Sequence, residues 1–591
     1  MSGVALAVAD DAIAAVDAML ARSPHRGARR LRVGTGGAVA GVAVPDDRPD
    51  DGSVAQDGPW LCAFAGALDN AGPLAADLGL APGSSAAEVV LAGFAARGEA
   101  FANAMRGVYG VALTDGREVA AWRDHIGLMP LHYRVDGAAV VVATEAKQVI
   151  AGAGLPYEPD LDVVVAILHE DITDETPAAL RGVSRLRKGS VLRTGPGRPA
   201  RTTGYWHPED VIETGRYADD ELQDRFDELM AQAVARSMRG DDVVLLSGGI
   251  DSPAVAAYAS SHSRAAYGHP VDALSTVYPD YPAVDESELI TLVATAFGMP
   301  LRTYSFDEPH LAELQDWMRL ADGPVPTVVL ADAADAYRRS RAMGRSTVLT
   351  GDLAEFVIDQ RDHVAAHYLR RGQLRHLVRE LGYRRGRPGA ARRIAAELLS
   401  AAVPHPVKVA VRDRRPPDVR PMLAPWLDPS LHLLPRVAEK SPVAHRWREG
   451  QYRFLEGPGL SVEADEVCQE ACGVRARHPW VDIDLWELFL SLPAAQKHPG
   501  PLPKALVRRL LRGGVPDEIL DRRRKVVFND AVVGRIDYDA LTRWLKAPTT
   551  RLPGVDYDVL WQRVERRDLD IVEYMWAKDL AATHAFLALW D

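Results

Sequence analysis

The chain has 591 residues, of which 47% are hydrophobic and 25% charged, so it reads as a soluble globular protein that is too long for a single core. Its formal net charge of -12 argues against a protein that wraps nucleic acid, and we expect no nucleic-acid partner. Three cysteines, Cys62, Cys468 and Cys472, are too few for a disulfide framework. No apolar run reaches bilayer length, so we expect a cytoplasmic protein without a membrane segment.

The first third of the chain favours β structure. Short Val, Ala and Leu runs are punctuated by glycine, as in residues 31–44 and 137–146, while the apolar spacing of residues 86–105 predicts a helix. Residues 193–216 then concentrate Gly, Pro, Thr and Arg without periodicity. We therefore predict one domain over 1–206, a linker over 207–217 and a second domain over 218–591.

The second domain alternates helices and strands. Apolar spacing predicts helices over 219–238, 252–262 and 285–298, with strands over 242–247 and 273–279 between them. This order is typical of a parallel, doubly wound α/β sheet, which binds ligands beyond the carboxyl ends of its strands. An Arg-rich stretch at about 360–435 predicts inserted basic helices, either as a solvated face or as a docking surface for an acidic substrate or partner.

The sequence VVLLSGGIDS, residues 243–252, places two glycines between hydroxyls and a carboxylate directly after a predicted strand. Consecutive backbone N–H groups at a helix start bind anions, and glycine allows the close approach that a phosphate needs. The stretch has neither the lysine of a Walker A loop nor the third glycine of a dinucleotide motif. We predict a nucleotide phosphate site here, with Asp251 as a ligand for Mg²⁺.

Several motifs in order resemble the asparagine synthetase B family. In the second half these are LLSGGIDS, LTGDLAEFVID, GVRARHPWVDIDLWELFLSLP and VPDEILDRRRKVVFND; in the first half they are RGVYGVALTDGREVAAWRDHIGLMPLHY and ATEAK. The resemblance implies an α/β and α+β two-domain protein. Its N-terminal half would be an Ntn-type αββα sandwich of the class II glutamine amidotransferases, and its C-terminal half a PP-loop doubly wound parallel sheet with added helices.

The resemblance also implies roles for residues of the second half. ATP would be held by Leu245, Ser247, Gly248, Gly249, Asp251, Ser252, Ser275, Val277 and Gly351, and Mg²⁺ by Asp251 and Glu355. Lys525 would face the pyrophosphate. Asp352 takes the position of a family glutamate that is tyrosine in β-lactam synthetases, where it pairs with a downstream glutamate as base. Glu463 and Glu466 are the candidates for that downstream residue, and the general base stays open.

The first half departs from the glutaminase pattern. That fold uses a cysteine at position 2 as nucleophile, but this sequence has Ser2. The family's Asn-Gly-Glu is replaced by Ala65-Gly66-Ala67, and its Arg-Gly-Pro-Asp by Arg26-Gly27-Ala28-Arg29. We therefore expect no working glutaminase.

These features predict an ATP-dependent amide ligase that passes through an acyl-adenylate, releases AMP and pyrophosphate, and uses an amine other than glutamine-derived ammonia. The sequence most resembles lasso-peptide cyclases and β-lactam synthetase-like members, and macrolactam closure of a lasso precursor is the leading hypothesis. A β-lactam synthetase-like cyclase, an intermolecular amide ligase and a non-catalytic scaffold are alternatives. The expected partners are a peptide or small carboxylate with its amine, and a precursor protease or leader-binding protein.

Overall fold

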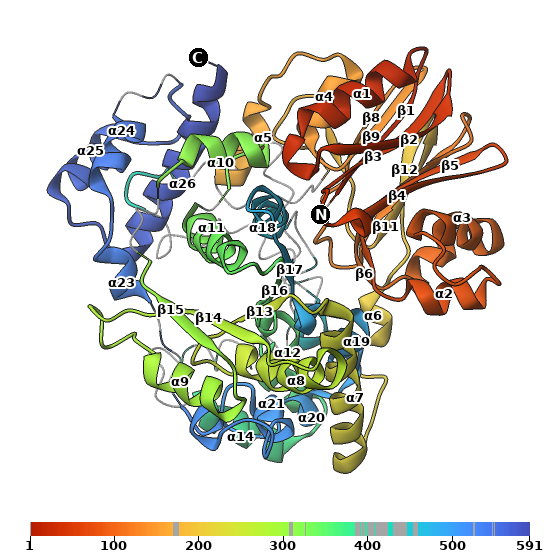
Figure 1. The fold of residues 1–591 in the computed structure, drawn as a ribbon. Coiled ribbons are helices and arrows are strands. Elements are labelled where there is room, and N and C mark those ends of the chain that lie inside the picture. Colours follow the sequence, from red (N-terminus) through yellow and green to blue (C-terminus); the bar gives the residue numbers. More distant parts are fainter. Residues whose placement is uncertain are drawn as a thin grey trace.

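Two antiparallel six-stranded sheets and one parallel five-stranded sheet organise the chain (Figure 1). The computed structural model describes residues 2–168, 176–306, 311–325, 327–384, 446–452, 459–523, 526, 528–546, 548 and 550–590. Between these ranges it describes 392, 395, 398, 403, 407, 424–428 and 455. The antiparallel sheets use residues 3–204 and the parallel sheet uses 242–477.

The antiparallel sheets face each other as a sandwich at the right of Figure 1. The first has the order β10-β8-β9-β1-β3-β2. Its strands are β1 (Gly3–Val8), β2 (Arg29–Thr35), β3 (Ala38–Val44), β8 (His132–Asp136), β9 (Ala139–Ala143) and β10 (Ser184–Arg185). The second has the order β12-β11-β7-β6-β5-β4. Its strands are β4 (Gly52–Asp57), β5 (Trp60–Leu68), β6 (Gly107–Thr114), β7 (Val119–Arg123), β11 (Ser190–Gly195) and β12 (Arg198–Gly204).

Strand β1 shows why this half of the sequence is so continuously apolar. Side chains on a strand alternate between its two faces. Val4, Leu6 and Val8 join the core between the sheets, whereas Ala5 and Ala7 pack on the helix side. Because both faces of β1 are buried, neither set of positions can be polar.

Helices cover both outer faces of the sandwich. Helices α1 (Ala12–Arg22) and α4 (Ala146–Ala153) pack on the first sheet, and α3 (Ala86–Arg97) packs on the second, with α2 (Ala71–Asp77) beside it. The predicted αββα arrangement is therefore confirmed. The helix predicted over 86–105 is shorter than expected. It ends at Arg97 because Gly98 takes a φ of +59°, and the 3₁₀ helix η3 (Gly98–Ala104) follows.

The parallel sheet has the order β15-β14-β13-β16-β17. Its strands are β13 (Asp242–Leu245), β14 (Asp272–Thr276), β15 (Leu301–Tyr304), β16 (Thr347–Leu349) and β17 (Arg475–Arg477). The helices between and before them are α7 (Asp219–Ser237), α8 (Asp251–Tyr267), α9 (Ser287–Ala296), α10 (Leu314–Ala321), α11 (Thr327–Ala342) and α18 (Leu460–Ala471). The predicted doubly wound sheet is confirmed.

The two faces of this sheet pack against different helices. Val244 and Leu349 share a core with residues of α7 and α8. Val243 and Val348, their neighbours along the strands, share another core with residues of α11 and α18. This alternation is the reason that the central strands read as uninterrupted Val and Leu runs.

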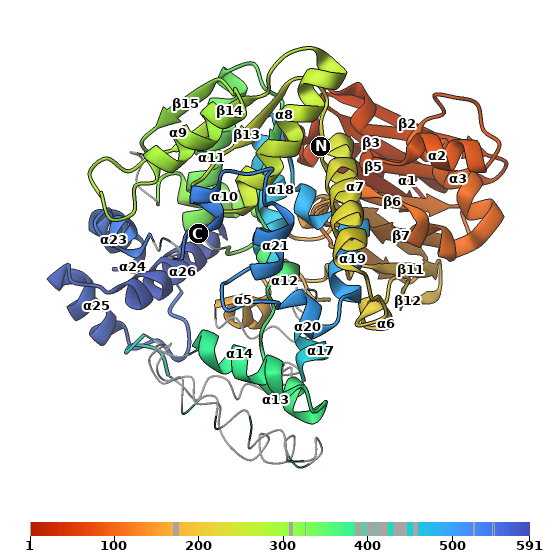
Figure 2. The same ribbon diagram turned by 90° about the horizontal axis from the view of Figure 1, so that it is seen from below.

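The remaining helices surround this sheet, and in Figure 2 α13 and α14 lie at the lower edge, away from the sandwich. The helices are α5 (Leu161–Leu168), α6 (Pro208–Val211), α12 (Glu355–Ile358), α13 (Val364–Arg370), α14 (Leu374–Arg384), α17 (Trp447–Gly450), α19 (Ile483–Ser491), α20 (Ala494–Lys497), α21 (Ala505–Leu510), α22 (Asp517–Leu520), α23 (Asn529–Val533), α24 (Tyr538–Leu545), α25 (Tyr557–Arg566) and α26 (Ile571–Leu587). The 3₁₀ helices are η1 (Pro24–Arg26), η2 (Pro49–Asp51), η7 (Pro479–Val481) and η8 (Ala588–Trp590).

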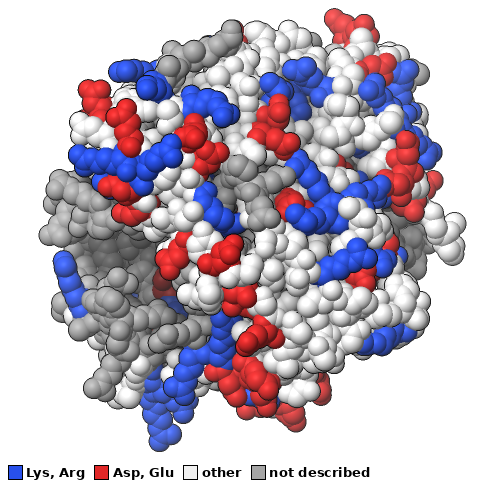
Figure 3. Space-filling view, turned by 60° about the vertical axis from the view of Figure 1, so that its left-hand side comes forward, with Lys and Arg blue, Asp and Glu red and all other residues white. Residues whose placement is uncertain are grey.

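Helices α13 and α14 belong to the predicted basic insertion, most of which lies outside the described residues. None of the helices in the described part of the chain combines the length and the apolarity needed to cross a bilayer. On the face shown in Figure 3, basic and acidic side chains are interspersed over the described surface.

Candidate active site

The loop predicted to bind nucleotide phosphate joins β13 to α8. The hydroxyl oxygen of Ser252 accepts a hydrogen bond from the Ser247 N–H at 2.9 Å and lies 2.9 Å from Ser247 Oγ. The Gly249 N–H in turn donates to Ser247 Oγ at 3.3 Å. Since α8 starts at Asp251, the positive end of its dipole points toward this loop.

The segment after β16 packs directly on that loop. A Cβ atom on Gly351 would lie 2.4 Å from the Ser252 nitrogen and 2.8 Å from the carbonyl carbon of Asp251, so only glycine fits there. Asp352 and Glu355 follow within four residues, and both side chains are exposed. The structure thus brings the predicted Gly351, Asp352 and Glu355 segment beside the phosphate loop.

Lys504 reaches the same place from a distant part of the sequence. Its ammonium forms an ion pair with the carboxylate of Asp251, and its backbone N–H donates to Asp359 Oδ2 at 3.0 Å. Lys504 has a φ of +55°, which favours glycine and costs energy for a lysine. Sequence reasoning missed Lys504, and its signal was weak: a lone lysine between a proline and a helix.

The predicted Mg²⁺ ligands fit a site that is completed by ATP. Mg²⁺ is typically held by one or two carboxylates together with phosphate oxygens, and Asp251 and Glu355 offer two carboxylates on adjoining segments. Within the described residues no group of three or more His, Cys, Asp or Glu side chains could hold a metal ion.

A second polar group lies at the carboxyl ends of β16 and β17. Thr350 Oγ1 accepts a hydrogen bond from the Asp352 N–H at 3.1 Å and lies 2.7 Å from His478 Nδ1. His478 Nε2 is 4.0 Å from Asp465 Oδ2, and the Tyr337 hydroxyl donates to Asp465 Oδ1 at 2.9 Å. Burial raises the pKa of Asp465, and the charge of Asp352 raises it further. This group links the Asp352 backbone through Thr350 to the His478 imidazole, which lies near the half-buried carboxylate of Asp465.

The other predicted nucleotide ligands line the ends of β13 and β14. Leu245 is half-buried in β13, and the Ser275 hydroxyl donates to the Leu246 carbonyl oxygen at 2.5 Å. The Val277 N–H donates to the Tyr304 carbonyl oxygen at 2.8 Å. The Ser275 hydroxyl and the Val277 N–H thus already have partners within the protein. Lys525 lies outside the described residues.

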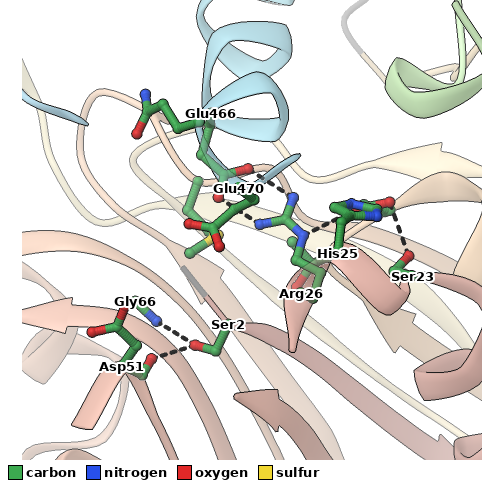
Figure 4. Close-up of polar contacts among 12 residues, drawn as sticks. Ser2, Ser23, His25, Arg26, Asp51, Gly66, Glu466 and Glu470 are labelled. Carbon is green, nitrogen blue, oxygen red and sulfur yellow. Dashed lines mark hydrogen bonds and ion pairs between the residues drawn. The ribbon is translucent and has the colours of Figure 1, made fainter. Parts of the chain in front are cut away.

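Glu463 and Glu466 are held in the contact between the two halves of the chain, as Figure 4 shows for Glu466. Arg123 Nη1 lies 2.7 Å from Glu463 Oε1 and Arg185 Nε lies 3.0 Å from Glu463 Oε2. Arg26 Nη2 donates to Glu466 Oε2 at 2.7 Å. Both glutamates are buried. Glu463 and Glu466, predicted as candidates for the general base, thus lie against arginines of the sandwich, whereas Asp465 on the same helix approaches His478.

The charges around Arg26 and Glu463 shift pKa values strongly. Burial alone would raise the pKa of Glu463, but Arg185 and Arg123 outweigh it and hold the pKa below the usual range. Burial likewise opposes the ionisation of Glu145, yet His25, Lys147 and Arg26 hold its pKa well below the usual range. Both carboxylates are therefore charged at neutral pH, and Glu463 binds arginines that belong to the other half of the chain.

At the position of the glutaminase nucleophile, Ser2 is fully buried. Its hydroxyl donates to the Asp51 carbonyl oxygen and accepts a hydrogen bond from the Gly66 N–H at 3.1 Å (Figure 4). The guanidinium of Arg26, also fully buried, is bound by the carboxylates of Glu145 and Glu466. The residues that would bind and attack glutamine are thus occupied by groups of the protein itself.

Residues 225–589 match the family model for asparagine synthase, and residues 2–206 match that for a glutamine amidotransferase domain. The chain belongs to the asparagine synthase family. The structure agrees with both matches, since the amidotransferase match covers the sandwich and the asparagine synthase match covers the parallel sheet. The family uses ATP to form amide bonds, and this chain is an asparagine synthetase-like enzyme.

Relatives of the chain are distant. A protein of Mycobacterium tuberculosis (strain ATCC 25618 / H37Rv), provisionally named asparagine synthetase (glutamine-hydrolyzing), is 26% identical over 464 residues, which are 74% of this chain and 69% of that protein. Amidase chry2 of Gibberella zeae is 25% identical over 286 residues, or 46% of this chain and 42% of that protein. A glutamine phosphoribosylpyrophosphate amidotransferase from B. subtilis, solved with ADP and GMP, is 14% identical, covering 59% of this chain and 81% of its own, with a TM-score of 0.27.

Proposed function

We propose that this asparagine synthetase-like enzyme joins a carboxylate to an amine through an acyl-adenylate, without hydrolysing glutamine. The carboxylate oxygen attacks the α-phosphorus of ATP, and the bond to the β-phosphate oxygen breaks to release pyrophosphate. The amine nitrogen then attacks the acyl carbon, the carbon–oxygen bond to AMP breaks, and the amine loses one proton. Atoms and charge balance with one amide, AMP and pyrophosphate as products.

The proposal is carried by a contrast between the two halves. At the β13–α8 loop, backbone donors, Asp251 and Lys504 converge as a phosphate site would require. At the glutaminase position, Ser2 stands in place of the nucleophilic cysteine, and Ala65 and Ala67 replace the polar residues of the family's Asn-Gly-Glu. An enzyme that keeps the first site and loses the second needs an amine that is supplied by a substrate.

Each step has candidate residues. The loop from Ser247 to Ser252 binds the phosphates, and Asp251 and Glu355 hold the Mg²⁺, which neutralises phosphate charge when bound. The Lys504 ammonium, beside Asp251, stabilises the negative charge on the departing pyrophosphate. Lys525 is assigned the same task from the family resemblance alone.

Asp352, beside the β13–α8 loop, is the candidate acceptor of the amine proton. Asp352 is exposed beside the phosphate loop and is joined through its backbone N–H to Thr350, which contacts His478. The Tyr337–Asp465 pair lies behind the imidazole. We assign the acceptance of the amine proton to Asp352, with His478 and Asp465 setting the charge around it.

We further propose macrolactam closure of a lasso-peptide precursor as the specific reaction. It is supported by the acidic residue at 352 and by the long basic insertion, both of which resemble lasso cyclases more than β-lactam synthetases. A β-lactam synthetase-like cyclisation, an intermolecular amide ligation and a scaffold role without catalysis are the alternatives. The partner proteins proposed are a precursor protease or a leader-binding protein.

The test is carboxylate-dependent exchange of labelled pyrophosphate into ATP, followed by mass spectrometry. With Mg²⁺-ATP and a leader-free precursor peptide, the expected product is one water lighter than the peptide and has a threaded ring. Turnover of a small β-amino acid instead of the peptide would favour the β-lactam reaction. If neither exchange nor AMP arises with any carboxylate, the scaffold role is correct.

A further inference from the structure

The phosphate loop of this structure already holds an anion, the side chain of Glu286. Glu286 lies directly before α9, and its Oε2 accepts a hydrogen bond from the Gly248 N–H at 3.0 Å. Its other oxygen pairs with Arg522, whose Nη1 donates to the Gly248 carbonyl oxygen at 2.9 Å. Both the N–H and the carbonyl oxygen of Gly248 are therefore held by this one ion pair.

The contact is close and well shielded. A Cβ atom on Gly248 would lie 2.8 Å from the Glu286 Cβ and 2.9 Å from its Cδ, so the carboxylate rests directly on the glycine backbone. The Glu286 side chain is 10% exposed and that of Arg522 23%. A hydrogen bond between an ionised carboxylate and a backbone N–H in such surroundings is stronger than one between neutral groups.

The Gly248 N–H that binds Glu286 is also a donor that a bound phosphate would need. In a loop of this kind, successive backbone N–H groups turn toward one anion. The Ser247 N–H is taken by Ser252, and the Gly249 N–H makes only a 3.3 Å bond to Ser247 Oγ. A phosphate oxygen and the Glu286 carboxylate cannot share the Gly248 N–H, because two negative charges at that spacing repel each other.

We infer that Glu286 is an internal competitor of the ATP phosphates. In the empty protein it satisfies the Gly248 N–H and the Arg522 guanidinium. When ATP binds, the phosphates take over both groups and Glu286 moves away. The apparent affinity for ATP is then reduced by the fraction of molecules in which Glu286 occupies the loop. The inference rests on the proposed use of ATP at this loop.

The decisive variant is Glu286→Gln, which keeps the shape and one acceptor oxygen but removes the charge. If the occupied loop outweighs the open one by about ten to one, the Kd for Mg²⁺-ATP falls about tenfold in this variant. Isothermal titration of the full-length protein with Mg²⁺-ATP, and separately with pyrophosphate, measures this change. Glu288→Gln, an exposed glutamate two residues on, is the matched control and leaves the Kd unchanged.

A second variant tests the exchange of partners. Arg522→Gln removes the cation that the phosphates take over, so we expect ATP binding at least tenfold weaker, even though the same variant loosens Glu286. Circular dichroism and thermal unfolding of each variant report whether it is folded. Folding of Glu286→Gln is expected because the substitution preserves the side-chain volume.

The outcomes separate this inference from the proposed function. If the wild-type protein binds Mg²⁺-ATP but Glu286→Gln binds it equally or more weakly, Glu286 supports the loop rather than competing, and the inference is overturned. If neither the wild-type protein nor the two glutamate variants binds Mg²⁺-ATP, the proposed function is wrong, and the inference that rests on it is wrong as well. Tighter binding in Glu286→Gln alone supports both.

Discussion

Lys504 has a strained backbone conformation, and its ammonium forms an ion pair with Asp251. A lysine with a φ of +55° costs about 1–3 kcal/mol relative to an unstrained position, and nothing in the local sequence requires that conformation. Its backbone N–H is fixed by Asp359 and its ammonium by Asp251. Strain of this kind is retained where a side chain is needed in one place, which for Lys504 is the phosphate loop.

Replacing Lys504 by glycine separates stability from activity. The Lys504→Gly variant relieves the backbone strain but loses the partner of Asp251, so we expect its free energy of unfolding to stay within about 1 kcal/mol of the wild type. We expect the rate of ATP–pyrophosphate exchange to fall at least about 100-fold. Urea denaturation and the exchange assay check the two parts. A large loss of stability, or normal exchange, would show that Lys504 is only structural.

Ser2 is the residue at which the loss of glutaminase chemistry can be tested. Restoring the thiol alone in Ser2→Cys should release no glutamate from glutamine, because Arg26 is saturated by Glu145 and Glu466, and Ala65 and Ala67 supply no polar side chain. An enzyme-coupled glutamate assay detects the product. Glutamine hydrolysis that saturates with substrate would contradict this expectation.

Helix α18 is one of the elements that join the two halves of the enzyme. Glu463, Glu466 and Glu470 recur at intervals of three and four residues, which places them on one helix face. That face meets Arg123, Arg185, Arg26 and Arg48 of the sandwich. Asp465, on another face, contacts Tyr337 and approaches His478. One helix thus connects the interdomain contact to the candidate site.

The pair between Arg26 and Glu466 should behave as a coupled unit. Arg26→Met strands the buried Glu466 carboxylate and should cost about 3–5 kcal/mol of stability, whereas Glu466→Met leaves Arg26 paired with Glu145 and should cost less. The double variant removes the lone Glu466 charge, so its loss should be clearly smaller than the sum of the two. Urea denaturation of the four proteins gives the coupling energy. Additive losses would mean that the pair contributes no interaction of its own.

The elements of both halves could largely be predicted from the sequence, because apolar periodicity and glycine position are local signals. These signals predicted the strand ends, the SGGIDS loop and the helix that starts at Ala86. They could not predict which distant residues contact the loop. Glu286, Lys504 and Arg522 meet Gly248 and Asp251 across separations of 38 to 274 residues, which no local pattern encodes. The arginine partners of Glu463 could not be predicted either, since its spacing from His478 does not reveal which helix face it occupies.

For the whole molecule, buried histidines make stability depend on pH. Burial lowers the pKa of His125 to about 3, and those of His132 and His584 to about 4, compared with 6.5 for an ordinary histidine. Below pH 6.5 the unfolded chain therefore binds more protons than the folded one, and stability falls as the pH drops. Above pH 6.5 these three groups contribute no pH dependence.

The size of this effect can be measured. Each of the three histidines contributes a slope of up to about 1.4 kcal/mol per pH unit between pH 4 and 6.5. Urea denaturation at pH 5.0, 5.75, 6.5 and 7.5 should show stability rising steeply up to 6.5 and more gently above it, where the histidines no longer contribute but buried Lys497, whose pKa is lowered to about 7, still does. His584→Gln, which can keep a hydrogen bond to Tyr557, should reduce the slope by about a third. A flat profile between pH 5.0 and 6.5 would contradict this account.

The acidic face of α18 also bears on why an amidotransferase-like half would persist in an enzyme that we propose does not hydrolyse glutamine. If residues 1–206 were cut away, Glu463 and Glu466 would lose the arginines that neutralise them, and Glu470 would lose its contact with Arg48. The severed synthetase half would present a row of like charges on the helix that carries Asp465. Expressed alone, that half would hold these carboxylates in water at close spacing, so its stability should rise with added salt, which screens their repulsion.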